Sequence, residues 1–274
     1  MAASPRSPLS TLRPGAIKEH YDDFAWVYQT YWGEHIHHGL FLTGEESAQV
    51  AQENLLRHCA ALAEVARGST VADVGCGHGG TARFLAREYG CHVEGLTISE
   101  TQWMMARESA KSFCGPGSLK FDLADAEHFQ FAPSHFDVVW NMESSEHFFD
   151  KARYFRKVAE TLKAGGRLLL AAWTGSMRKH VVREIAATFL CPGLLTAQEY
   201  AELIQDAGLR VTAHDEAGPR VAKTWDLCAE HARSAKAVLR MLPKRYRDFA
   251  EGIALMREGY RSGDLNYSIF AAKK

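Results

Sequence analysis

The chain has 274 residues, of which 46% are hydrophobic and 24% are charged, and its formal net charge is −1. This length and hydrophobic content suit one large α/β domain with a small appended cap. Because charges of both signs are interspersed and no apolar run is as long as a bilayer span, the composition argues against a nucleic-acid partner and a membrane span.

The start of the chain and its cysteines bear on the cellular compartment. Residues 1–18 contain Pro, Ser and basic residues but no acidic residue. We interpret them as a disordered leader, with a transit peptide as the alternative. The six cysteines form no CxxC pair and no signal-peptide pattern is present, so we expect reduced thiols in a cytoplasmic protein.

Helices and strands follow in a regular order. Apolar residues at helical spacing predict helices over 19–32 and 46–66. Alternating helical and apolar segments then predict strands at 70–74, 91–98, 118–122, 136–141, 167–173 and 209–214, with a closing strand at 265–272. Near-continuous apolar strands separated by helices predict a Rossmann-like, seven-stranded, mostly parallel sheet with helices on both faces.

An apolar stripe in residues 224–262 predicts a helical cap inserted before the last strand. The stripe is consistent with packing against the sheet and with a lid over a substrate. The predicted organisation is therefore a leader (1–18), N-terminal helices that close over the site (19–66), a cofactor-binding core (67–175), and the rest of the core with its cap (176–274).

Residues 71–80 read VADVGCGHGG, which predicts a strand that ends in a glycine-rich turn before a helix. Gly75, Gly77 and Gly79 let the backbone approach a ligand closely. Asp73, just before them, would repel a dinucleotide pyrophosphate at the helix N-terminus. The acidic turn instead favours a ligand with cationic groups. S-adenosylmethionine, with its ammonium and sulfonium, is such a ligand, so the turn indicates methyl transfer.

Further motifs follow the glycine turn in a fixed order: GLTISETQ at 95–102, ADA at 124–126 and NMESSEH at 141–147. An earlier segment reads WGEHIHHGLF at 32–41. Together they resemble the class I S-adenosylmethionine-dependent methyltransferases, and within them the γ-tocopherol methyltransferase-like enzymes, which are related to the cyclopropane fatty and mycolic acid synthases. The resemblance covers residues 19–175 by motif and the remainder by element order.

The resemblance implies how the chain would bind S-adenosylmethionine and release S-adenosylhomocysteine. Thr97 stands where most class I enzymes carry an acid, a departure that the tocopherol and cyclopropane-synthase relatives share. Each implied contact comes from a matching motif position: Asp73, Gly75, Gly77 and Gly79 for the methionine moiety, Thr97 and Gln102 for the ribose, Asp125 and Ala126 for the adenine, and Asn141 and Tyr21 as further contacts.

Methyl transfer from an activated donor mainly requires alignment of the acceptor and exclusion of water. A base is needed only if the acceptor loses a proton. The candidates are Glu143, Glu146 and His147 after the strand 136–141, and His37 from the N-terminal segment. In the cyclopropane-synthase relatives the Glu that matches Glu146 holds a bicarbonate base. Here Glu146 either acts directly or orients His147, and a helix first-turn carboxylate is the structural alternative.

The sequence predicts no metal site, because the histidines at 35, 37 and 38 lack a clear further ligand. We expect a small, largely apolar acceptor of aromatic, isoprenoid or polyketide-like type, methylated on C, O or N in specialised metabolism. A monomer and a homodimer both remain open. The alternatives are an NAD(P)-dependent oxidoreductase on a doubly wound sheet and a non-catalytic S-adenosylmethionine-binding protein.

Overall fold

Seven strands form one sheet in the order β3-β2-β1-β4-β5-β7-β6 in the computed structural model, which describes residues 12, 15–235, 241 and 243–274. Strands β1 to β5 pair in parallel, whereas β7 runs antiparallel to both β5 and β6. The predicted mostly parallel sheet is confirmed. The strands are β1 (Thr70–Val74), β2 (His92–Thr97), β3 (Ser118–Leu123), β4 (Phe136–Met142), β5 (Leu162–Gly175), β6 (Arg210–Glu216) and β7 (Leu265–Lys273).

Helices cover both faces of the sheet, and each face has its own apolar core. Successive strand residues alternate between the two cores: Val71 of β1 belongs to one and Ala72 to the other, as the pleat requires. Helices α2 (Ala48–Leu62), α3 (Gly80–Tyr89) and α4 (Glu100–Lys111) contribute to the first core, and α5 (Lys151–Thr161) and α7 (Ala197–Asp206) to the second.

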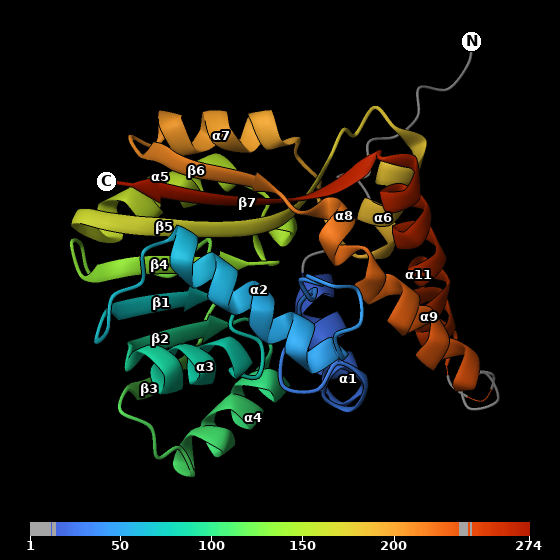
Figure 1. The fold of residues 1–274 in the computed structure, drawn as a ribbon, viewed down its shortest axis with the longest axis horizontal. Helices are drawn as coiled ribbons and strands as arrows, with labels where there is room; N and C mark the ends of the chain where they lie inside the picture. The colour runs from blue at the N-terminus through green and yellow to red at the C-terminus, as the bar shows by residue number, and fades with distance from the viewer. Residues whose placement is uncertain (1–11, 13–14, 236–240, 242) are drawn as a thin grey trace.

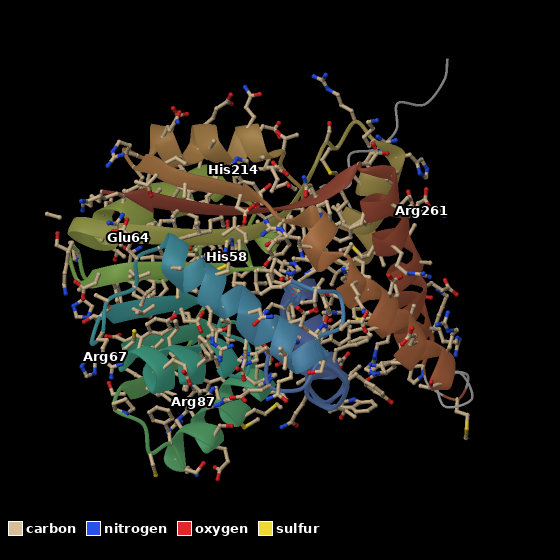
Figure 2. The ribbon with its side chains drawn as sticks, viewed as in Figure 1. His58, Glu64, Arg67, Arg87, His214 and Arg261 are labelled. Carbon is tan, nitrogen blue, oxygen red and sulfur yellow. The ribbon has the colours of Figure 1, made fainter. Side chains whose placement is uncertain are left out.

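A hydrogen bond joins α2 to β6, and an aromatic stack joins β6 to β7. His58 Nε2 of α2 lies 2.6 Å from Asp215 Oδ2 of β6, and the ring of His214 stacks on that of Phe270 at 4.2 Å. Figure 2 shows these histidines among the side chains that surround the ribbon, with the labelled charges Arg67, Arg87 and Arg261 toward the outer edges of the view. Among the described residues, no helix is long and apolar enough to cross a membrane.

The remaining helices gather beside the carboxyl ends of the central strands, as Figure 1 shows. They are α1 (Ala16–Tyr31), α6 (His180–Thr188), α8 (Gly218–Val221), α9 (Lys223–Ser234) and α11 (Lys244–Ser262). The predicted apolar stripe lies on α11, where Tyr246, Phe249 and Ile253 are buried. Its first turns pack against α1, with the ring of Phe24 4.5 Å from Tyr246 and 5.1 Å from Phe249, and the helix as a whole packs mainly against α6 and α9. A cap helix and the N-terminal helix thus form one aromatic layer.

Several predicted boundaries differ from the structure. Residues 16–18, which we assigned to the leader, form the first turn of α1, where Lys18 pairs with Asp22 at 2.6 Å. In the described part of the predicted cap, α9 ends at Ser234 and α11 begins at Lys244. Strand β5 begins five residues before the predicted 167, across a register irregularity opposite Phe136. Residues 1–11 and 13–14 of the predicted leader lie outside the described residues.

Candidate active site

The glycine turn after β1 brings two loops into close contact. Gly75 has φ +80°, and a Cβ built on it would lie 2.3 Å from Ser144 Cβ in the loop after β4. Only glycine fits this combination of left-handed backbone and close approach. Gly77 also has a positive φ, +54°, but a Cβ placed there would have Ile36 Cδ1 as its nearest neighbour, at 3.5 Å. The turn is therefore packed at Gly75 and open at Gly77.

A large cleft of about 480 Å³ opens where β1, β2 and β4 end. In a parallel sheet, this edge is the usual place for a ligand. A smaller cavity, which we call the turn cavity, lies beside it and is lined by Asp73, His37, Glu34 and the glycine turn. Most predicted cofactor residues line the large cleft: Tyr21, Gly75, Gly77, Thr97, Gln102, Asp125 and Ala126.

Two predicted cofactor residues are not among those that line these cavities. Gly79 backs onto the sheet, since a Cβ there would lie 2.7 Å from the Phe121 ring. Asn141 is fully buried; its amide nitrogen donates to Tyr154 Oη at 2.8 Å and its oxygen accepts from the Ser145 N–H at 3.2 Å. The structure thus places both residues as supports of the loops around the cleft.

The carboxyl of Asp73 is buried, and its hydrogen bonding is incomplete among the described residues. It is 3% exposed, and no group among the described residues hydrogen-bonds its Oδ2. Burial raises its pKa to about 7. A carboxyl in this state gains most from a positively charged donor, which the ammonium of S-adenosylmethionine supplies. The residues at this end of the site therefore fit the predicted ligand.

Thr97 and Gln102 are joined by a hydrogen bond of 3.2 Å from Thr97 Oγ1 to Gln102 Oε1. This bond directs the amide nitrogen of Gln102 away from Thr97, where it has no partner although it is buried. A free donor of this kind suits a ribose hydroxyl. Asp125, in contrast, is tied into its own loop by the Glu127 N–H at 2.9 Å and by His128 Nδ1 at 2.8 Å.

Asp22 of α1 is a residue that the sequence analysis missed. Its Oδ1 accepts from Ser99 Oγ at 2.6 Å and from the Thr101 N–H at 3.1 Å, both at the start of α4. Ser99 in turn caps α4 by accepting from the Gln102 N–H. Helix α1 is thereby fastened to the same turn that positions Gln102.

Glu143 is a fully satisfied buried carboxylate. Oε1 accepts from the His38 N–H at 2.8 Å and from Tyr267 Oη at 2.9 Å; Oε2 accepts from His38 Nδ1 at 3.0 Å and from Trp173 Nε1 at 3.1 Å. Burial alone would raise its pKa, but the interactions with His38 outweigh it and lower the pKa to about 2. The residue has φ +51°, an unusual backbone for glutamate. With four donors around it, Glu143 has no free oxygen for a proton.

Glu146 lies three residues further on and differs from Glu143 in its hydrogen bonds and in the direction of its pKa shift. Its Oε1 accepts from the Trp173 N–H at 2.7 Å, whereas its Oε2 has no partner among the described residues. Burial raises its pKa to about 8. At neutral pH the side chain is therefore mostly protonated, and its free oxygen side can donate a hydrogen bond.

The side chains of His147 and Tyr21 contact each other, and both line the large cleft. Tyr21 Oη lies 2.8 Å from His147 Nε2, and His147 Nδ1 lies 3.3 Å from the Leu190 carbonyl. Because a carbonyl only accepts, His147 carries its proton on Nδ1 and its Nε2 accepts from Tyr21. Burial lowers the pKa of His147 to about 4. Both ring nitrogens are thus engaged, and His147 holds Tyr21 in place.

His37 has one engaged and one free ring nitrogen. Its Nδ1 lies 2.7 Å from the His38 carbonyl, which fixes the proton on Nδ1. Its Nε2 is then a bare lone pair, and no described group hydrogen-bonds it although the side chain is buried. Burial lowers its pKa. His37 lies at the boundary between the turn cavity and a second cavity further inside.

This second cavity, the inner chamber, measures about 50 Å³. It shares Tyr21, Ile36, Glu143 and His147 with the large cleft. Its other walls are mainly aromatic and include Tyr28, Trp32, Trp173, Phe189, Trp225 and Phe249, with His37 and Glu146 as polar members. A group in the chamber would therefore face the large cleft across the four shared side chains.

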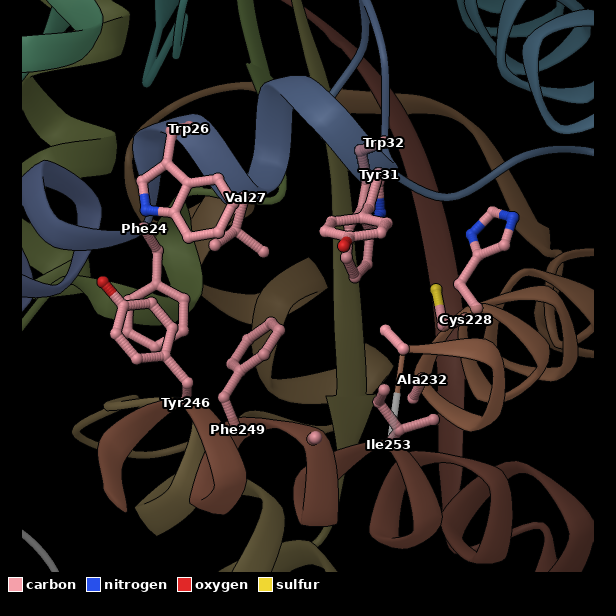
Figure 3. A pocket seen from close by; sticks show the side chains of 13 residues that line it. Phe24, Trp26, Val27, Tyr31, Trp32, Cys228, Ala232, Tyr246, Phe249 and Ile253 are labelled. Atoms are coloured by element: carbon pink, nitrogen blue, oxygen red, sulfur yellow. The ribbon is translucent and has the colours of Figure 1, made fainter. Parts of the chain in front are cut away.

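An apolar surface groove adjoins the inner chamber. Figure 3 shows it between α1, which contributes Trp26, and the cap helices, which contribute Cys228 and Ile253. Trp32 and Phe249 line both the groove and the chamber. These two rings are thus the wall between the chamber and the surface.

The histidines of the N-terminal segment do not form a metal site in the described part of the chain, where no three His, Cys, Asp or Glu side chains are grouped to hold an ion. His35 is buried with neither ring nitrogen paired, and burial lowers its pKa to about 2. His78 contacts the N-terminal segment through the Gly33 carbonyl at 3.1 Å from its Nε2.

Comparisons with known proteins identify the family of this chain. The family model of mycolic acid cyclopropane synthetase matches residues 11–268. The tocopherol O-methyltransferase of Arabidopsis thaliana, a chloroplastic protein, is 27% identical over 99% of this chain and 85% of its own. The 2-methyl-6-phytyl-1,4-hydroquinone methyltransferase of Synechocystis sp. is 31% identical over 73% of this chain and 67% of its own.

A solved structure has the same fold. The mycolic acid cyclopropane synthase CmaA1, complexed with SAH and CTAB, superposes with a TM-score of 0.85 at 21% identity, covering 97% of this chain and 100% of that one. The chain therefore belongs to the mycolic acid cyclopropane synthetase family and is a class I S-adenosylmethionine-dependent methyltransferase.

Proposed function

We propose that this enzyme methylates a small, largely apolar acceptor of aromatic, isoprenoid or polyketide-like type, in the cytoplasm and in specialised metabolism. The observation that carries the proposal is the aromatic inner chamber, which shares a wall with the large cleft. Relatives whose names specify a phytyl hydroquinone or a rifamycin support the acceptor class.

In this proposal the large cleft and the turn cavity hold S-adenosylmethionine, which supplies a methyl group already activated on a sulfonium. Asp73 pairs with the ammonium, the open Gly77 backbone lies along the methionine moiety, and Gln102 donates to the ribose. Ala126 contributes its backbone N–H at the adenine. Tyr21 and Ile36 line both the large cleft and the inner chamber, so they flank the place where donor and acceptor would meet.

The reacting group of the acceptor enters the inner chamber. Because the chamber is small, the rest of the acceptor must extend elsewhere, and the surface groove behind Trp32 and Phe249 is the adjoining apolar space. Burying an apolar tail there is favourable by about 25 cal/mol per Å². Alignment of the acceptor in such a closed space is the main contribution the protein makes to methyl transfer.

The alternatives from the sequence analysis fit less well. An NAD(P) cofactor would bring a pyrophosphate beside Asp73 at the start of α3. A non-catalytic binding protein has no need for an aromatic chamber beside the methyl donor.

A transfer assay tests the proposal. Tritium-labelled S-adenosylmethionine is incubated with the protein and a panel of prenylated hydroquinones, simple phenols and macrolide precursors, and organic-soluble label is counted. The variant Phe249→Ala opens the chamber wall and is expected to raise the acceptor KM while leaving cofactor affinity unchanged. Leu42→Ala, at an exposed site, is the matched control. Label transferred to protein or nucleic acid instead would overturn the acceptor class.

A further inference from the structure

We infer that the inner chamber recognises a hydroxyl group on the acceptor, with His37 Nε2 accepting the hydroxyl proton and Glu146 donating to the oxygen. The inference rests on the proposed function, since it concerns the same chamber. It starts from the hydrogen-bonding capacity that the chamber leaves unused.

Almost every titratable side chain of the chamber is already committed. Glu143 accepts four hydrogen bonds, and His147 uses both ring nitrogens. His38 is likewise engaged at both nitrogens, by Glu143 on one side and by the Trp225 N–H at 2.7 Å on the other. His20 Nε2 is engaged by Tyr28 Oη at 2.9 Å.

Two buried polar atoms remain without a partner among the described residues of the chamber: His37 Nε2 and Glu146 Oε2. The first can only accept, because the His38 carbonyl fixes the ring proton on Nδ1. The second belongs to a carboxyl that burial keeps protonated at neutral pH, so it can donate. The chamber therefore presents one acceptor and one donor, and buried polar groups of this kind favour a ligand that pairs both.

A hydroxyl is the group that satisfies both and still reacts. It donates its proton to His37, accepts from Glu146 with one lone pair, and keeps a second lone pair for the methyl group. A neutral amine has a single lone pair, so a hydrogen bond from Glu146 would consume the electrons needed for attack. An acceptor without a hydroxyl does not make both bonds and keep its nucleophilic electrons free. The pair therefore selects a hydroxyl-bearing acceptor over an amine or a hydrocarbon.

The proton and the charge also balance. In transfer to the hydroxyl oxygen, that oxygen forms a bond to the methyl carbon, the carbon–sulfur bond breaks with its electrons going to sulfur, and the hydroxyl proton moves to His37 Nε2. The positive charge thus passes from the sulfonium to the His37 ring. Glu143, which stays ionised and interacts favourably with the charged form of His37, stabilises the ring in that state. Solvent then takes the proton.

Nitrogen NMR on the full-length protein tests the inference without turnover. Protein labelled with ¹⁵N in its histidine rings is saturated with S-adenosylhomocysteine, and then phenol, aniline and toluene, which are matched in size, are titrated in. We expect phenol to bind about tenfold more tightly than toluene and to shift the His37 Nε2 resonance. His37→Gln identifies that resonance, and His180→Gln, at an exposed site at the start of α6, is the control.

Two Glu146 variants separate donation from negative charge. Glu146→Gln keeps a donor and should retain phenol binding, whereas Glu146→Leu should lower phenol affinity to that of toluene. Equal affinity for the three probes, an unmoved His37 resonance, or no saturable phenol binding would overturn the inference. Failure of the proposed function is distinguishable, because it would be seen in the transfer assay, as label on protein or nucleic acid, and not in these titrations.

Discussion

Glu143 and Glu146 lie three residues apart just after β4, yet the structure holds the first as a carboxylate and the second as an acid. Glu143 is surrounded by four donors that lower its pKa to about 2, whereas Glu146 accepts a single backbone bond and its pKa rises to about 8. Opposite pKa shifts in neighbouring groups indicate a division of roles. In our proposal, Glu143 organises the loop and Glu146 faces the acceptor.

Amide substitution should separate the two glutamates by stability. In Glu143→Gln, the new NH₂ group opposes donors from His38 and Trp173, so we expect a loss of roughly 2–4 kcal/mol in the free energy of unfolding. In Glu146→Gln, the amide replaces a group that is already neutral, so stability should be unchanged or higher. Urea unfolding at pH 7 measures both, and a larger loss for Glu146→Gln would contradict the assignment.

Asp73→Asn should weaken cofactor binding and stabilise the ligand-free protein. The pKa of Asp73 is raised in the folded protein, so its favourable contribution is complete below about pH 4 and is lost as the pH rises through about 7. The ligand-free variant should therefore have a higher Tm than the wild type at pH 8, and the difference should shrink at pH 5. S-adenosylmethionine should bind the variant far more weakly, because the ammonium loses its charged partner.

Thermal scans across this pH range, with isothermal titration of S-adenosylmethionine, give both quantities for Asp73→Asn. A Tm difference that does not change with pH would show that the ionisation of Asp73 is not what destabilises the ligand-free fold.

Gly77→Asp should abolish cofactor binding and leave the fold intact. The position is open, with only Ile36 near the place that a Cβ would take, so the new side chain enters the cleft and brings a charge with it. The strain of its positive φ costs about 1–2 kcal/mol. Gly208→Asp is the matched control, since Gly208 has φ +85° and open space but lies between α7 and β6. Equal cofactor affinity for the two variants, measured by titration, would contradict the placement of the turn.

Asp22→Ala should loosen helix α1 over the cleft. The substitution leaves the Ser99 hydroxyl and the Thr101 N–H without their acceptor, so we expect faster amide exchange in α1 and weaker cofactor binding by about tenfold. Asp23→Ala, next in sequence but directed to Arg245 at the surface, is the control. Hydrogen exchange followed by mass spectrometry measures amide exchange in α1 of both variants. Identical exchange in the two would show that Asp22 does not hold α1 against the start of α4.

The sequence predicted the sheet, the glycine turn and most of the cleft because these depend on local patterns. A strand ending in Asp73 and Gly75 specifies its own geometry, and Thr97 follows from the next strand end. The inner chamber could not be predicted in the same way. Trp173, Trp225 and Phe249 come from separate elements, and their meeting depends on how the cap packs on α1.

Which ring nitrogens of His37 and His147 are hydrogen-bonded could not be predicted from the sequence either. Both residues stand in motifs that the sequence singled out. However, the His38 and Leu190 carbonyls that fix their protons are tertiary or local backbone contacts that no spacing reveals. Asp22 was missed because a lone acid on an amphipathic helix carries no sign of its partner 77 residues away.

Equilibrium dialysis with tritium-labelled S-adenosylmethionine shows whether the cleft bounded by the glycine turn, Thr97 and Gln102 holds the methyl donor, on which every other assignment depends. The wild type should bind the donor saturably at a single site, S-adenosylhomocysteine should displace it, and Gly77→Asp should not bind it. Absence of saturable binding, or displacement by NAD(P) rather than by S-adenosylhomocysteine, would contradict this placement of the methyl donor.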